Sequence, residues 1–273
     1  MTDLFRSRAA LFGAALCLVG ENASALTLVL DFGPAEDIYG DEMSDYDAAP
    51  FGFSALTQTS SQQAVLAAVQ DHYLNYPSLS QDTLSPLPDG YELDIHFELG
   101  AFGASPSNGD LDYYYVSIGV AQGGQSYLGL AWLDGVAAYS AGSIVAGVYT
   151  DNIAGMAGLA SSDDQLINLI AGTASHEIGH ALGLPHPEGT GTNPGESDWS
   201  VMATGVSPSF MPNAHRVLDR EFAYDEFADL IETVGLREAP ASAVPLPPAM
   251  ALLGAGALAL AGLRRRRGEA AAA

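Results

Sequence analysis

The sequence contains no lysine and a single cysteine, Cys17. Because Cys17 lies in an apolar segment near the N-terminus, the rest of the chain has no thiol for a disulfide or a thiolate metal ligand. The folded protein must therefore be stabilised by its apolar core and by any metal that it binds.

Basic residues are also scarce. Between Leu26 and Val244 the only basic side chains are Arg216, Arg220 and Arg237, whereas the same stretch holds 30 of the 33 acidic residues. Such a charge repels nucleic acid and anionic lipid, so we expect neither as a partner. Most carboxylates are expected on a solvated surface, although clustered carboxylates make calcium a second candidate cation. The calcium candidates are Asp37, Asp41, Asp45, Asp47, Asp110 and Asp112.

The N-terminus has the pattern of a secretory signal peptide. Arg6 and Arg8 precede the apolar run Ala9 to Val19, and Ala23-Ser24-Ala25 follows as an A-x-A site. We predict that residues 1–25 are removed after Ala25, with a buried N-terminal helix as the alternative. Cys17 leaves with this segment, and an exported protein without disulfides is more typical of a bacterium than of an animal.

Residues 241–273 form a tail of three parts. Val244-Pro245-Leu246-Pro247-Pro248 leads into the apolar run Ala249 to Leu263, and four arginines, Arg264 to Arg267, follow. This order resembles the PEP-CTERM class of bacterial sorting tails, in its VPLPA variant. The resemblance implies transient membrane association, removal by an exosortase-type enzyme, and export to the surface or matrix of a Gram-negative bacterium. A membrane anchor that stays in place is the alternative.

Residues 26–240 are predicted to form one domain of the α/β class. Strands are expected at Leu26–Phe32, Tyr91–Leu99, Tyr113–Val120, Leu128–Leu133 and Ser143–Thr150, and helices at Ser61–Tyr73 and Gln165–Leu182. Asp163 and Asp164 are expected to cap the second helix, because carboxylates favour a helix N-terminus.

The stretch from His176 to His186, HEIGHALGLPH, carries the strongest signal. On a helix, His176 and His180 project from one face, so their nitrogens can reach one zinc ion at about 2 Å. Glu177 is rotated to the side, where it can act as general base on a zinc-bound water. Gly183 permits a sharp turn at positive φ, which brings back His186 as the third ligand. Three histidines leave one position open, which is typical of a catalytic zinc.

HExxH alone arises often by chance, but HExxHxxGxxH fixes five positions and is expected on the order of once in 10⁵ chains of this size. The extended motif resembles that of the metzincin metallopeptidases. The resemblance implies a mixed, mostly parallel twisted sheet, a long zinc-binding active-site helix and a smaller irregular C-terminal subdomain. It also implies a methionine turn beneath the ligands. Met202, in Ser200 to Gly205, would be that methionine, a packing support and not a ligand.

Within the matrixin/serralysin group, Pro187 and the sequence Ser200-Val201-Met202 resemble the serralysins more. Thr204, however, stands where serralysins carry a tyrosine ligand. The matrixin propeptide cysteine and structural-zinc histidine are also missing. The resemblance implies that an extended substrate hydrogen-bonds to an edge strand made of Gly129, Leu130, Ala131 and Trp132. Val201 to Gly205 would line the pocket after the cleaved bond. The other histidines, His72, His96 and His215, lack metal-ligand spacing and are expected in the core or on the surface.

These observations predict a secreted zinc-dependent metalloendopeptidase that hydrolyses internal peptide bonds of extracellular proteins, with a protein or peptide as substrate. One alternative is a catalytically silent zinc-binding surface or matrix protein on the same fold. Another is a processing protease for one surface partner. Glu177 favours an enzyme, because a purely structural zinc site does not need that carboxylate.

Overall fold

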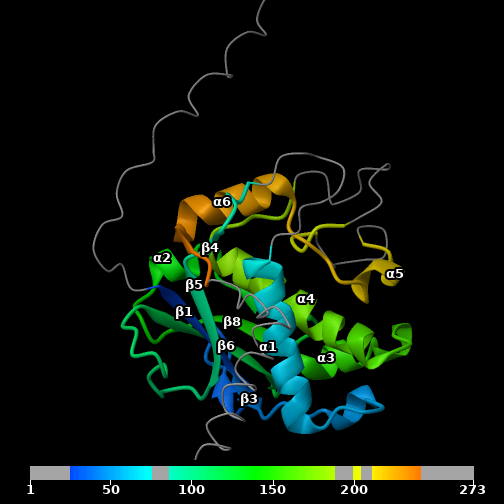
Figure 1. The fold of residues 1–273 in the computed structure, drawn as a ribbon. Coiled ribbons are helices and arrows are strands. Elements are labelled where there is room, and N and C mark those ends of the chain that lie inside the picture. The colour runs from blue at the N-terminus through cyan, green and yellow to red at the C-terminus, as the bar shows by residue number, and fades with distance from the viewer. Residues whose placement is uncertain (1–24, 76–85, 188–198, 204–210, 241–273) are drawn as a thin grey trace, which may run out of the picture.

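A seven-stranded sheet with helices packed against it dominates the computed structural model, which describes residues 25–75, 86–187, 199–203 and 211–240 (Figure 1). The strands of this sheet are β1 (Leu26–Asp31), β2 (Ala35–Glu36), β3 (Glu42–Ser44), β5 (Ile95–Gly100), β6 (Tyr113–Ala121), β7 (Gly129–Ala131) and β8 (Ile144–Tyr149). A second, two-stranded sheet joins β4 (Tyr91–Leu93) to β9 (Leu236–Glu238). The helices are η1 (Ala49–Phe51), α1 (Gln58–Leu74), α2 (Gly135–Ala138), α3 (Thr150–Ala154), η2 (Ala157–Leu159), α4 (Asp163–Ala181), α5 (Asn213–Arg216) and α6 (Tyr224–Val234).

The main sheet is mixed and mostly parallel, as predicted. Strands β5, β1, β6 and β8 lie side by side and run parallel, whereas β7 pairs antiparallel with β8 at the edge. The six residues of β1 are all buried, in keeping with the continuous apolar run of a parallel strand covered on both faces. The chain is therefore confirmed as a mixed α/β fold.

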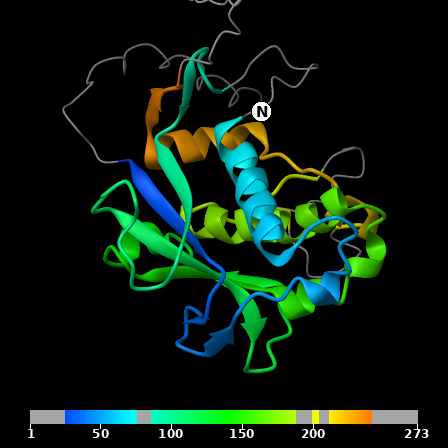
Figure 2. The ribbon, with the colours of Figure 1, turned by 60° about the horizontal axis from the view of Figure 1, so that its bottom comes forward.

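Helices α1 and α4 pack on one face of the sheet and cross each other, as the cyan and yellow-green helices in Figure 2 show. Helix α4 is buried along most of its length, with Ile170, Ala174 and Ile178 fully inside the core. A helix this enclosed holds its side chains in place through packing on several sides. It is therefore a rigid base for the histidines near its C-terminal end.

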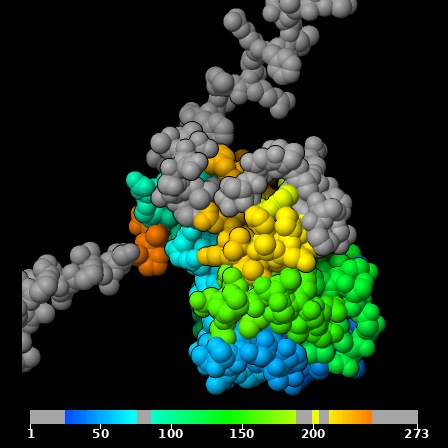
Figure 3. Space-filling model, turned by 90° about the vertical axis from the view of Figure 1, so that its right-hand side faces the viewer, coloured from blue at the N-terminus to red at the C-terminus, as the bar shows by residue number. Residues whose placement is uncertain are grey.

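The start of α4 differs from the prediction. Its N-cap is Ser162, whose hydroxyl accepts the Gln165 N–H at 3.3 Å, and not Asp163. The carboxylate of Asp163 instead accepts the backbone N–H groups of Ser54 and Ala55, each at 2.8 Å, and these bonds lower its pKa. Asp163 therefore ties α4 to the segment after η1, and Figure 3 shows these blue and green segments next to one another.

The predicted strand Tyr91–Leu99 is divided at Asp94, whose N–H donates to the carbonyl of Gly235. Its first part, β4, leaves the main sheet and pairs with β9 near the C-terminal end of the described chain. The region after Gly183 is also more regular than predicted, because it contains α5, α6 and β9. Apolar side chains of α6, among them Phe227 and Leu230, are buried in the same core as α4.

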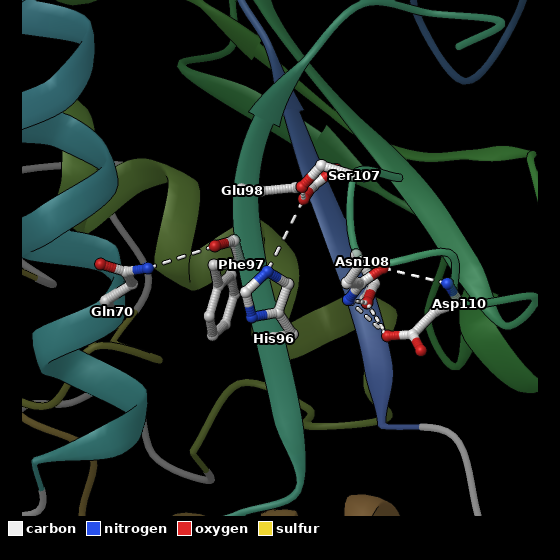
Figure 4. A network of polar contacts seen from close by, with 8 residues as sticks. Gln70, His96, Phe97, Glu98, Ser107, Asn108 and Asp110 are labelled. Carbon is white, nitrogen blue, oxygen red and sulfur yellow. Dashed lines mark hydrogen bonds and ion pairs between the residues drawn. The ribbon is translucent and has the colours of Figure 1, made fainter. Parts of the chain in front are cut away.

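Polar contacts lie on both sides of β5 (Figure 4). On the side away from β1, Gln70 on α1 donates from Nε2 to the carbonyl of Phe97 at 3.1 Å. On the side of β1, Glu98 accepts the Ser107 N–H at 2.8 Å. A contact such as that of Gln70 helps to protect an edge strand against pairing with another chain. The opposite edge of the sheet is formed by β7.

The predicted signal peptide (1–25) lies almost wholly, and the predicted sorting tail (241–273) wholly, outside the described residues. Across the described part of the chain, no helix combines the length and the apolar character needed to cross a bilayer.

Candidate metal centre

The three histidines of the motif converge at the C-terminal end of α4. His176 and His180 are one turn apart on the helix, and Gly183 follows with a φ of 95°. The backbone N–H of Gly183 donates to the carbonyl of His180, and that of Leu184 to the carbonyl of Gly179, both at 2.9 Å. These two bonds reverse the chain directly after the helix, in the manner of a glycine C-cap. The reversal brings His186 back to the helical pair.

The Nε2 atoms of these histidines form a small triangle. His176 Nε2 lies 3.1 Å from the Nε2 atoms of both His180 and His186, which are 3.0 Å apart. The Nδ1 atoms of His176 and His180 lie 2.9 Å and 2.7 Å from the carbonyl oxygens of Val201 and Leu184. A carbonyl only accepts, so both Nδ1 atoms carry the proton and both Nε2 atoms present lone pairs.

Neutral imidazole lone pairs that face each other at 3 Å repel unless a cation lies among them. Burial is the largest cause that lowers the pKa of His176, His180 and His186, and it keeps all three in the neutral form that binds metal. Three neutral imidazoles, two of them with the opposite ring nitrogen fixed by a carbonyl, form the donor set of a zinc site. The residues present therefore fit a zinc ion.

No further group of three or more histidine, cysteine, aspartate or glutamate side chains comes close enough to hold a metal within the described residues. Of the calcium candidates, Asp37 is buried, and its carboxylate accepts the N–H groups of Tyr39 and Asp41 and the hydroxyl of Tyr149. Calcium binding stays a prediction.

Glu177 lies beside the histidines and under the first residue of β7. Its side chain is 7% exposed, and a Cβ atom on Gly129 would come within 2.5 Å of its Cγ and 2.7 Å of its Oε1. Burial raises the pKa of the Glu177 carboxyl to about 8. Glycine at position 129 is thus what allows the strand to lie directly over this carboxylate.

The strand β7 has a free edge. The bonds from Tyr149 N–H to Leu128 O and from Trp132 N–H to Val145 O place the backbone groups of Leu128, Leu130 and Trp132 toward β8. Backbone groups alternate in direction along an antiparallel strand, so those of Gly129 and Ala131 point outward. No described residue pairs with them. The predicted substrate strand is therefore an edge strand next to Glu177.

Met202 and its neighbours lie beneath the histidines. Met202 is fully buried, and a Cβ on Gly179 would overlap its sulfur. Val201 supplies the carbonyl that accepts from His176. This position agrees with a packing role for Met202. Thr204 and Gly205 lie outside the described residues.

A buried polar group behind this segment was not foreseen from the sequence. Arg220 is half-buried, and desolvation lowers its pKa to about 10. Its Nη1 lies 3.3 Å from the Ser200 carbonyl and 3.5 Å from that of Val201. The Ser200 hydroxyl donates to Glu226 Oε1 at 2.8 Å. The Nε atom of Arg220 is buried without a partner among the described residues. A clue was available, because a basic residue in so acidic a domain is unusual.

The remaining histidines lie elsewhere. His72 is buried between α1 and α4, with Nδ1 2.7 Å from the Ser175 hydroxyl and Nε2 3.2 Å from Asp219. His96 is half-exposed on β5 near Glu98, and the ring of His215 contacts that of Trp199. None of the three joins the metal group.

Residues 91–187 match the family model of reprolysin-like metallopeptidases of the M12B family. This match spans β7, α4 and all three histidines. The chain carries a zinc metallopeptidase-like domain with a three-histidine site. The matching model is the reprolysin-like one, so the matrixin or serralysin placement stays a prediction. No curated protein matches this domain or the rest of the chain.

Several solved structures are distantly similar to the chain. Archaemetzincin from Methanopyrus kandleri is 15% identical with a TM-score of 0.36, over 79% of this chain and 98% of that one. A zinc-dependent peptidase from Methanocorpusculum labreanum is 14% identical with a TM-score of 0.37, over 75% and 99%. The GM1-bound ECX AB5 holotoxin is 13% identical with a TM-score of 0.31, over 78% and 79%. With TM-scores below 0.5, these likenesses are loose.

Proposed function

We propose that the chain is a zinc-dependent metalloendopeptidase that hydrolyses internal peptide bonds of extracellular proteins. The observation that carries the proposal is the placement of Glu177 between the triangle of histidine nitrogens and the free edge of β7. A purely structural zinc site needs neither a neighbouring carboxylate nor an open strand edge.

His176, His180 and His186 would hold the zinc ion through their Nε2 atoms. When bound, zinc supplies Lewis-acid chemistry, which polarises a carbonyl and lowers the pKa of a water molecule. The carbonyls of Val201 and Leu184 keep the first two rings in the ligating tautomer and orientation.

Glu177 is the general acid and base of the proposed reaction. With a pKa of about 8 before metal binding, its carboxyl is poised to exchange protons near neutral pH. A cation held by the histidines favours its ionised form. The carboxylate then accepts a proton from the attacking water and delivers it to the leaving amine.

The substrate would add to the sheet as a further strand. The outward N–H and C=O groups of Gly129 and Ala131 offer backbone hydrogen bonds to an extended peptide. The backbone groups of Leu130 and Trp132 face β8, so these two residues would contact the substrate through their side chains. Such main-chain pairing is independent of side chains and suits an endopeptidase that accepts an internal segment.

The test is cleavage of casein by the full chain, measured together with its zinc content. We expect one zinc per chain, cleavage that a chelator abolishes, and a Glu177→Gln variant that keeps zinc but loses cleavage. A Glu177→Gln variant that cleaved at the normal rate would refute the mechanism. One bound zinc without cleavage of any protein would favour the silent surface or matrix protein, and cleavage of one surface partner alone would favour a processing protease.

We also propose that the protein is secreted through the N-terminal segment and reaches the surface of a Gram-negative bacterium by way of the C-terminal tail. The support is the order of motifs in residues 1–25 and 241–273. Mass spectrometry of the protein from its producing cells should find an N-terminus at Leu26 and a chain shortened near Val244 by an exosortase-type enzyme. An intact tail in the mature protein would instead indicate a permanent anchor.

A further inference from the structure

Three aromatic side chains gather where β7 ends, and we call them the aromatic cluster: Tyr39, Trp132 and Tyr139. The ring centroids of Tyr39 and Trp132 are 5.3 Å apart at 86°, and those of Trp132 and Tyr139 are 6.0 Å apart at 30°. Tyr39 is 61% exposed and Tyr139 is 42% exposed, so burial in the core does not account for their position. Exposed aromatic groups of this size commonly mark a binding surface.

The cluster is held in place by a buried carboxylate. Asp37 accepts the Tyr39 and Asp41 N–H groups through Oδ1 at 2.8 and 3.0 Å, and the Tyr149 hydroxyl through Oδ2 at 2.8 Å. These bonds fasten the turn between β2 and β3, which carries Tyr39, to the main sheet. The ring of Tyr39 is therefore presented by a fixed turn, which lowers the entropy lost on binding.

The cluster faces the side of the sheet opposite α4. A side chain at Gly129 would point toward Glu177. Gly147 is paired with Leu130, and a Cβ at Gly147 would point the other way, to within 3.4 Å of the Asp37 Cβ. Side chains alternate along a strand, so Leu130 and Trp132 share the face of Asp37 and Tyr39. A peptide paired with β7 would direct every second side chain to this same face.

The surroundings of the cluster are negatively charged. Glu36, Asp41 and Glu42 are exposed beside Tyr39, and Asp134 is exposed two residues after Trp132. The three arginines of the described chain are engaged elsewhere. Arg216 is buried, Arg220 has its Nη1 3.3 Å from the Ser200 carbonyl, and Arg237 pairs with Glu92 at 2.7 Å. Aromatic faces next to carboxylates attract cations, and arginine stacks on them most often.

We propose that the aromatic cluster binds an arginine or lysine side chain of the peptide substrate, about three residues before the cleaved bond. This inference rests on the proposed function. Gly129 lies next to Glu177, where the bond is cleaved in the proposed reaction. Trp132 is three residues further along the strand, a distance of about 10 Å. A peptide antiparallel to β7 places its earlier residues toward Trp132. The basic side chain therefore lies on the N-terminal side of the cleaved bond.

The first test moves one arginine along an otherwise neutral peptide substrate and measures kcat/KM for the zinc-loaded full chain. We expect arginine at the third residue before the cleaved bond to raise kcat/KM about 5-fold over citrulline there, the effect of an exposed cation–π contact. Trp132→Ala and Tyr39→Ala should each reduce this preference. The control Tyr91→Ala removes another exposed aromatic ring, on β4, and should keep it.

The second test measures binding without turnover. Zinc-loaded Glu177→Gln protein should bind a fluorescent peptide with arginine at that position about 5-fold more tightly than the citrulline peptide, and salt should weaken the difference. Equal affinity and equal cleavage of the arginine, citrulline and phenylalanine peptides would overturn the inference while leaving the proposed function intact. A preference on the C-terminal side of the bond would also overturn it. Absence of cleavage of every peptide and protein would refute the proposed function, and the binding measurement would still decide the role of the cluster.

Discussion

Gly179 faces the sulfur of Met202 so closely that the helix has no room for a side chain there. Gly172, seven residues earlier on α4, has the same relation to Arg220, because a Cβ there would lie 2.8 Å from Nη2. Residues seven apart share one helix face. Each glycine costs the helix about 1 kcal/mol relative to alanine. Gly179 makes room for Met202 against the helix that carries the histidines, and Gly172 makes room for the guanidinium of Arg220.

Gly179→Ala should therefore lower stability and zinc affinity together. Overpacking of a core costs about 1–3 kcal/mol, and displacement of Met202 would move the neighbouring Val201 carbonyl. Thermal unfolding and zinc titration would measure both effects. The control Gly158→Ala meets no atom within 4 Å and should change stability by no more than about 0.5 kcal/mol. Equal unfolding temperatures and zinc affinities of the two variants would show that the contact with Met202 does not contribute to stability or to zinc binding.

Arg220 should matter more for the metal centre than for stability. A guanidinium whose Nε is buried without a partner among the described residues is costly to the fold, so Arg220→Met should leave the zinc-free protein as stable as the wild type or more stable. It should also weaken zinc binding about 10-fold, because Arg220 lies against the Val201 carbonyl that orients the ligand His176. The control Arg237→Met removes a partly exposed ion pair and should not alter zinc affinity. Loss of stability without loss of zinc affinity would make Arg220 a purely structural residue.

Gly129→Ala should reduce catalysis and spare the metal. The new methyl group would meet the Cγ of Glu177 at 2.5 Å and push its carboxylate aside. A misplacement of about 1 Å lowers kcat about 100-fold, whereas none of the three histidines is touched. Peptide turnover and zinc content per chain are the measurements. Normal turnover by this variant would mean that the carboxylate can act from another position.

Glu177 should make the zinc-free protein less stable as the pH rises. Its folded pKa of about 8 exceeds the ordinary value of 4.5, so the folded chain retains a proton that the unfolded chain has lost. The resulting loss of stability starts near pH 4.5, has a slope of at most about 1.4 kcal/mol per pH unit, and ends near pH 8. Zinc-free Glu177→Gln lacks this loss. Urea unfolding at pH 5 to 9 should show the two proteins diverging, and parallel curves would contradict the assignment.

The local parts of the site were predictable from the sequence, whereas its supports were not. The spacing of His176 and His180 on a helix and the turn at Gly183 depend on bonds between near neighbours in the chain. The carbonyl of Val201 and the guanidinium of Arg220 come close to the site only through tertiary packing. Neither a valine nor an arginine in the sequence indicates that it will support a metal ligand.

The fold shows the same division. The apolar run of β1 predicted a buried parallel strand, and the alternation near Tyr91 predicted a strand there. The departure of β4 toward β9 could not be foreseen, because it depends on a partner strand about 145 residues away. Ser162 displaced Asp163 as the helix cap because Asp163 is bonded to Ser54 and Ala55, a contact between distant segments.

The pairing of β4 with β9 also sets an order of events during translation. His186 leaves the ribosome before Arg220, Glu226 and β9, which support the ligands and close the second sheet. The roughly fifty residues from His186 to Glu238 take about 3 to 10 seconds to synthesise. During that interval the nascent chain has all three ligands but lacks the layer that positions them. Metal capture by the finished geometry must therefore wait at least until Arg220 and Glu226 have been made.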